Sequence, residues 1–238
     1  MEPVIAILAG GQSRRMGADK AMLRCGDATL LERAAATALA VAPPRVLIIG
    51  RAPPPSWPAA LPVRWALDQA LEPAPSAARG ELAEPPAATL RSASQVPPPF
   101  AVPSSAGGER SEAQSSRPGG PLSGLCTALH LSAAPVLALA CDMPLLTPQA
   151  LRWLLAQAGR AAAHGVVTTR EGQPEPLFTL YLPACLPLAQ ERLRAGQRSL
   201  RGLIEAGDFY RVAAPPDIAA CLANVNTPAD LASLPGLR

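Results

Sequence analysis

The sequence predicts an α/β fold built around a mostly parallel central sheet. The chain has 238 residues, a length that suits one ordinary α/β domain with a substantial core. Several short runs are continuously apolar, as in strands that are buried on both faces of a parallel sheet. These runs alternate with Ala- and Leu-rich stretches of helical length, and that alternation favours parallel strands joined by helices. In such folds ligands bind beyond the carboxyl ends of the strands.

The first third of the chain holds three of these apolar runs and one helical stretch. The run at residues 4–8 leads into a loop that begins with Gly10 and Gly11. A later run ends at Gly50, and a shorter one ends just before Asp68. The expected strands are residues 4–8, 45–49 and 63–66, with a helix at about residues 30–39.

The composition changes between about residues 72 and 118. Pro, Ala, Ser and Glu dominate this segment, and it has neither helical nor strand periodicity. Such composition is typical of disordered chain with stretches of polyproline II. We therefore expect a single domain over residues 1–238 that this segment interrupts. The segment is either a tolerated loop or a docking element for a partner.

The remaining elements follow in an alternating order. A helix is expected from the GGPL sequence at residues 119–122 to about residue 131. Thr147 and Pro148 predict the start of a second helix, as its N-cap and its first helical residue. The other expected elements are strands at residues 135–140, 165–168 and 177–181, helices at 186–195 and 199–206, and a short final helix after the NVNTP sequence at residues 224–228.

Charge and cysteine content exclude several classes of protein. The formal charge of +3 is spread along the chain without a basic block, which argues against a nucleic-acid binder. No run of about 20 apolar residues is present to span a membrane, and the amino-terminus lacks the features of a signal peptide. The five cysteines include no C-x-x-C pair, so structural zinc is not expected. Unpaired thiols suit the cytoplasm.

The loop at residues 8–20 carries the clearest chemical signal. Its sequence, LAGGQSRRMGADK, follows a predicted buried strand and combines three glycines with Arg15 and Lys20. Glycines let backbone N–H groups approach phosphate oxygens, and such nests bind anions. Arg15 presents a planar fork and Lys20 a compact charge. A Gly-rich turn also occurs for purely structural reasons, but the two cations favour phosphate binding.

Four sequence segments together resemble the molybdenum cofactor guanylyltransferases. The segments are LAGGQSRRMGADK at residues 8–20, GPLSG at 120–124, CDMP at 141–144 and NVNTP at 224–228. They occur in the family's order, and the resemblance covers the chain apart from the Pro-rich segment. It implies a three-layer Rossmann-like nucleotidyltransferase fold. It also implies transfer of GMP from GTP to the phosphate of molybdopterin, with release of pyrophosphate.

The resemblance assigns roles to individual residues. Lys20 and Arg15 would be catalytic, together with Asp142, which would also bind Mg²⁺. Asn224 and Asn226 would face the pterin substrate. The residues implied to bind GTP are Leu8, Ala9, Gly10, Gly11, Lys20, Asp68 and Asp142. The chain departs from the family at the end of the second strand, where an asparagine is common and this sequence has Ile49 and Gly50.

The residues themselves support a metal role for Asp142, and several alternatives stay open. A carboxylate at the end of an apolar strand is costly to bury unless it is paired or metal-bound, and Mg²⁺ takes one or two carboxylates plus substrate phosphates. The alternative roles for Asp142 are a helix N-cap or a turn aspartate. Asn224 and Asn226 are otherwise turn residues before the helix at Pro228. For Asp68, which borders the Pro-rich segment, the alternative is a structural role. The competing functions are cytidylyl transfer to the same cofactor, nucleotidyl transfer to another small phosphate, and a non-catalytic cofactor carrier. Molybdoenzymes or cofactor-insertion proteins would be the macromolecular partners.

Overall fold

The computed structural model describes residues 2–10, 19–68, 120–225 and 230. These residues belong to one of the two units into which the chain divides, residues 1–71 with 118–238. The second unit, residues 72–117, lies outside the described residues, so the expected disordered insertion at 72–118 stays a prediction.

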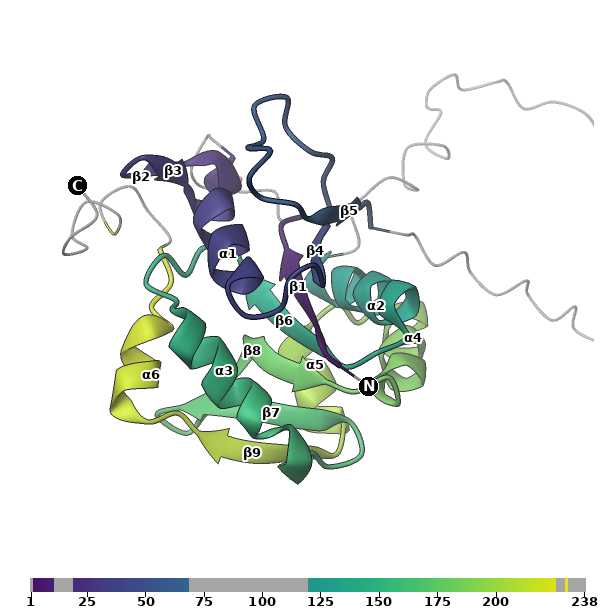
Figure 1. The fold of residues 1–238 in the computed structure, drawn as a ribbon. Coiled ribbons are helices and arrows are strands. Elements are labelled where there is room, and N and C mark those ends of the chain that lie inside the picture. The colour runs from purple at the N-terminus through teal and green to yellow at the C-terminus, as the bar shows by residue number, and fades with distance from the viewer. Residues whose placement is uncertain (1, 11–18, 69–119, 226–229, 231–238) are drawn as a thin grey trace, which may run out of the picture. The chain divides into compact units, whose positions relative to one another are not determined.

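Within the described residues, seven strands form one sheet in the order β5-β4-β1-β6-β8-β7-β9 (Figure 1). Strand β8 runs antiparallel to both of its neighbours, and the other neighbouring pairs are parallel. The strands are β1 Val4–Leu8, β4 Val46–Ile49, β5 Arg64–Ala66, β6 Val136–Ala140, β7 Gly165–Arg170, β8 Gln173–Tyr181 and β9 Phe209–Ala213. The prediction of a mostly parallel sheet is confirmed.

Helices cover both faces of this sheet, which gives the three layers that the sequence predicts (Figure 1). Alternate side chains of β1 point to opposite faces, so Ile5 and Ile7 join one core cluster and Ala6 joins the other. The first face packs against α1 Leu30–Leu39, α3 Pro148–Ala156 and α6 Pro216–Cys221. The second face packs against α2 Gly120–Ser132, α4 Cys185–Arg194 and α5 Leu200–Ala206.

Local sequence chemistry explains where these helices begin. Thr29 and Glu32 form a reciprocal capping box at the start of α1. Thr147 caps α3 and Pro148 occupies its first turn, as predicted. The structure also contains elements that the sequence reading missed, namely β9, α6 and the small hairpin of β2 Arg24–Cys25 and β3 Ala28–Thr29. The expected final helix after residue 228 lies largely outside the described residues.

The topology brings four strand ends to one edge of the sheet. Strands β5, β4, β1 and β6 are mutually parallel neighbours, so their carboxyl ends share that edge. The chain passes from β1 to β4 and β5 on one side and then returns to β6 on the other. Such a reversal of strand order opens a crevice between adjacent loops, and ligands bind there in α/β sheets.

Candidate active site

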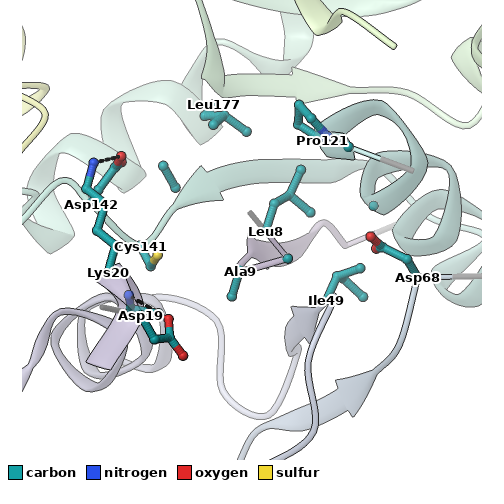
Figure 2. Close-up of a pocket in the computed structure, with 15 residues that line it drawn as sticks. Leu8, Ala9, Asp19, Lys20, Ile49, Asp68, Pro121, Cys141, Asp142 and Leu177 are labelled. Carbon is teal, nitrogen blue, oxygen red and sulfur yellow. Dashed lines mark hydrogen bonds and ion pairs between the residues drawn. The ribbon is translucent and has the colours of Figure 1, made fainter. Parts of the chain in front are cut away.

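A cavity of about 320 Å³ lies at this edge of the sheet (Figure 2). Its floor is formed by Leu8, Ala9 and Ile49 at the ends of β1 and β4. Polar groups stand at its two ends, with Lys20 and Asp142 at one and Asp68 at the other (Figure 2). The full set of lining residues is Leu8, Ala9, Gly10, Asp19, Lys20, Ala21, Ile49, Asp68, Gly120, Pro121, Gly124, Ala140, Cys141, Asp142 and Leu177.

The first end of the cavity is built around an ion pair between Lys20 and Asp142. Lys20 Nζ donates to Asp142 Oδ2 at 2.7 Å, and the two side chains are 14% and 24% exposed. Asp142 follows the last residues of β6, and its backbone oxygen accepts a hydrogen bond of 2.9 Å from the Val225 N–H. Both charged groups therefore reach the cavity while their backbones are fixed by neighbouring structure.

The turn that carries Lys20 is a short 3-10 helix, η1 Lys20–Met22. Asp19 caps this turn, because its Oδ1 accepts a hydrogen bond of 3.1 Å from the Ala21 N–H. Ala21 is almost fully buried and anchors the turn in the core. The preceding aspartate and the following alanine thus fix the direction from which the Lys20 ammonium enters the cavity.

Three glycines surround the carboxylate of Asp68 at the other end. A methyl group added at Gly10 would lie 3.2 Å from Asp68 Oδ2. One added at Gly50 or Gly124 would lie 3.5 Å or 3.3 Å from Oδ1. The lack of side chains at these positions leaves room for the carboxylate of Asp68. Burial raises the pKa of Asp68 above its ordinary value, because desolvation disfavours the charged form.

We expect Asp68→Asn to raise the melting temperature at pH 7 while it weakens nucleotide binding. The raised pKa means that ionised Asp68 costs the folded state free energy that the neutral amide does not. Below both the folded and the unfolded pKa, Asp68 is neutral in either state, so the stabilisation should disappear in acid. Calorimetric melting of both proteins between pH 3 and pH 8 measures it. If Asp68→Asn were less stable than wild type at every pH, ionised Asp68 would not be destabilising the folded state.

The residues that follow β1 and β4 come into close contact at Gly10 and Gly50. Gly50 has a φ of +94°, and a methyl group there would lie 2.5 Å from Gly10 Cα and 2.7 Å from Gly10 N. Only glycine fits at such a contact. A side chain at position 50 would therefore clash with the backbone of Gly10 in this chain.

The substitution Gly50→Asn should therefore destabilise the protein. Backbone strain of this kind costs on the order of 1–3 kcal/mol, and the clash with Gly10 adds to it. Thermal unfolding measures the loss. Gly172→Asn is the matched control, since Gly172 also has a positive φ of 76° but nothing within 4 Å of an added methyl group. Equal effects of the two substitutions would show that the contact with Gly10 is not the cause.

The structure brings together most of the residues singled out by sequence. The residues that line the common cavity are Leu8, Ala9, Gly10, Lys20, Asp68 and Asp142. Asn224 is exposed and outside the lining, although its neighbour Val225 is hydrogen-bonded to Asp142. Gly11, Arg15 and Asn226 lie outside the described residues.

The other lining residues were not predicted as site residues: Asp19, Ala21, Ile49, Gly120, Pro121, Gly124, Ala140, Cys141 and Leu177. Asp19 and Cys141 immediately precede Lys20 and Asp142, so adjacency in the sequence was a usable signal. Leu177 enters from β8, and no local pattern marks it. Burial, and then the neighbouring Asp142 carboxylate, raise the pKa of the Cys141 thiol to about 12. Cys141 therefore stays protonated at neutral pH and is a poor nucleophile.

The donor set at the first end suits a magnesium ion that is shared with a ligand. Among the described residues, no three His, Cys, Asp or Glu side chains gather in a way that could hold a metal ion by themselves. Mg²⁺ does not require such a cage, because it usually takes one or two carboxylates and completes its shell with phosphates and water. The partly exposed Asp142 carboxylate in the cavity fits that mode of binding.

One protein-family model matches most of the chain. The family model described as "MobA-like NTP transferase domain" matches residues 5–95 and 101–212. The chain belongs to this family. It is accordingly a nucleotidyltransferase, and the family carries the three-layer fold found here.

Individual proteins that resemble this chain are named probable molybdenum cofactor guanylyltransferases. A probable molybdenum cofactor guanylyltransferase of Synechococcus elongatus is 31% identical over 237 residues, which span 96% of this chain and 95% of that protein. One of Pelotomaculum thermopropionicum is 36% identical over 126 residues, which span 48% of this chain and 57% of that protein. The resemblance stated from the four sequence segments is confirmed.

Solved structures share the fold. Molybdopterin-guanine dinucleotide biosynthesis protein A from Archaeoglobus fulgidus superposes with a TM-score of 0.61 at 17% identity, covering 96% of this chain and 94% of that one. The 2-C-methyl-D-erythritol 4-phosphate cytidylyltransferase from Thermus thermophilus gives 0.52 at 14% identity, with 95% and 94% covered. The fold therefore serves more than one base and acceptor. In the part of the chain that the structure describes, no helix is long and apolar enough to cross a membrane.

Proposed function

We propose that the chain transfers GMP from GTP to the phosphate of molybdopterin, releasing pyrophosphate and forming molybdopterin guanine dinucleotide. The observation that carries this proposal is the cavity with two polar ends. Lys20 and Asp142 form the end suited to phosphates and a cation, and Asp68 stands opposite them among glycines (Figure 2). The names of the relatives supply the base and the acceptor.

The reaction needs positioning and charge neutralisation more than covalent help from the protein. An oxygen of the acceptor phosphate forms a bond to the α-phosphorus of GTP, and the bond from that phosphorus to the bridging oxygen of pyrophosphate breaks. Lys20 neutralises charge on the triphosphate. The apolar floor of Leu8, Ala9 and Ile49 gives the base and ribose a surface to pack on. The raised pKa of the Cys141 thiol makes it a poor nucleophile, so we propose direct transfer rather than a covalent intermediate on Cys141.

We assign Asp142 as the protein ligand of Mg²⁺. When bound, Mg²⁺ neutralises phosphate oxygens and acts as a Lewis acid at the reacting phosphorus. Asp142 pairs with Lys20 at 2.7 Å, so the carboxylate that would hold Mg²⁺ and the ammonium that would bind the phosphates lie side by side.

We place the nucleoside at the other end of the cavity. The Asp68 carboxylate there can accept hydrogen bonds from N–H groups of a base or hydroxyls of a ribose. Cytidylyl transfer to the same cofactor is the closest alternative. Relatives with that activity typically have alanine at the place of Gly10, where a methyl group would lie 3.1 Å from Gly50 Cα and 3.2 Å from Asp68 Oδ2.

Titration calorimetry with GTP, CTP, ATP and UTP in the presence of Mg²⁺ tests the base preference. We expect GTP to bind most tightly, with at least a tenfold margin over CTP. A preference for CTP would replace the proposal with the cytidylyl reaction. Binding of molybdopterin without binding of any triphosphate would favour a cofactor carrier.

A further inference from the structure

We infer that Arg51 is a positioning residue, which acts through Asp19 to aim the Lys20 ammonium at the triphosphate; this inference rests on the proposed function. Arg51 Nη2 lies 2.8 Å from Asp19 Oδ2, and the Arg51 side chain is only 19% exposed. Arg51 is outside the cavity lining itself. Its influence on the reaction must therefore pass through the aspartate.

Asp19 uses its two carboxylate oxygens for two different partners. Oδ2 pairs with Arg51, and Oδ1 accepts from the Ala21 N–H that opens the η1 turn. Two backbone hydrogen bonds close the turn. The Met22 N–H donates to the backbone oxygen of Asp19, and the Leu23 N–H donates to the backbone oxygen of Lys20. A carboxylate held at both oxygens has little rotational freedom, so the turn that projects Lys20 is held as well.

Arg51 itself is anchored to the sheet. It directly follows Gly50, whose N–H donates to the backbone oxygen of Ala66 in β5 at 2.9 Å. The Gly50 backbone also lies against the backbone of Gly10. The pair of Arg51 and Asp19 thus connects the end of β4 to the turn that carries Lys20. Asp19 is 49% exposed, and ion pairs exposed to this degree add little to stability. Such a pair affects the placement of a group more than the free energy of unfolding.

The sequence offers a direct probe of this placement. Of the 21 lysines and arginines in the chain, Lys20 is the only lysine. An amine-selective reagent therefore has two targets at most, the Lys20 ammonium and the amino-terminus. The rate at which Lys20 reacts reports how firmly it is held against Asp142, and this readout needs no nucleotide.

The experiment compares wild type with Arg51→Ala, using acetic anhydride labelling read by peptide mass spectrometry alongside steady-state kinetics with GTP. We expect Lys20 to be labelled several-fold faster in the variant, and the KM for GTP to rise about tenfold with a smaller change in kcat. Arg51→Lys should recover part of the loss, because it keeps the charge; peptide mapping separates the two lysines. Arg45→Ala removes an arginine paired with Glu2 at the amino-terminal side of β1 and should change neither readout.

Double variants decide whether the effect passes through Asp19 and Lys20. Asp19→Asn keeps an oxygen for the Ala21 N–H but loses the ion pair. Adding Arg51→Ala to Asp19→Asn, or to Lys20→Ala, should cause no further loss in kcat/KM. Additive losses, or unchanged labelling of Lys20 in Arg51→Ala, would overturn the inference. If wild type did not use GTP, the proposed function would fail, while the labelling rates would still decide whether Arg51 holds Lys20.

Discussion

Replacing Asp142 with alanine should reduce GMP transfer by at least a hundredfold. The Asp142 carboxylate lies 2.7 Å from the Lys20 ammonium in the cavity and is the group that we assign to Mg²⁺. Loss of one such electrostatic group typically costs on the order of 10²–10³ in rate, or about 3–4 kcal/mol of transition-state stabilisation. Pyrophosphate release under saturating GTP and Mg²⁺ measures the effect.

A further variant at position 142 separates the effect of charge from that of shape, and a second variant elsewhere serves as the control. Asp142→Asn keeps the size of the side chain but loses the charge, so it should be almost as damaging as alanine. Asp217→Ala is the control, because it removes an exposed carboxylate in the first turn of α6. Turnover of Asp142→Ala within threefold of wild type would remove this residue from the metal site.

Replacing Lys20 with methionine should raise the KM for GTP by about a hundredfold. The substitution keeps an unbranched chain of similar length and removes the charge that neutralises the triphosphate. It also leaves Asp142 without its partner at 2.7 Å. Initial rates over a wide range of GTP concentrations separate the change in KM from any change in kcat, and an unchanged KM would place Lys20 outside the nucleotide site.

Lys20→Arg is the more discriminating variant. Lys20 is the only lysine of the chain, whereas all its other Lys/Arg positions are arginine. A guanidinium is larger and planar and cannot replace a compact ammonium in a side chain that is 14% exposed. We expect only partial recovery relative to methionine. Full activity of Lys20→Arg would mean that charge alone matters at this position.

The sequence revealed the buried strands because their chemistry is local. Runs such as β1 and β6 are apolar at every position, and only a strand covered on both faces accommodates this. Asp142 could be predicted for the same reason, since a carboxylate directly after such a run must lie at a strand end. Strand β9 escaped prediction because it lies at the edge of the sheet with its side chains partly or fully exposed, which weakens the apolar pattern.

The contacts that complete the site depend on tertiary structure. The sequence shows Ile49 and Gly50 at the end of the second strand, but only the structure shows that Gly50 lies against the backbone of Gly10. The pairing of Arg51 with Asp19 likewise joins two loops that come together only when β1 and β4 are neighbours. Neither residue stands in a recognisable motif with the other, so no spacing rule could have found the pair.

The product of the reaction decides whether this chain makes a guanine dinucleotide from molybdopterin. Purified protein is incubated with molybdopterin, Mg²⁺ and an equimolar mixture of GTP and CTP, and the product is identified by mass spectrometry. We predict molybdopterin guanine dinucleotide as the main product, formed in equal amount with pyrophosphate and lost in Asp142→Ala. A cytosine dinucleotide as the main product, or consumption of GTP with no nucleotide attached to the pterin, would refute guanylyl transfer.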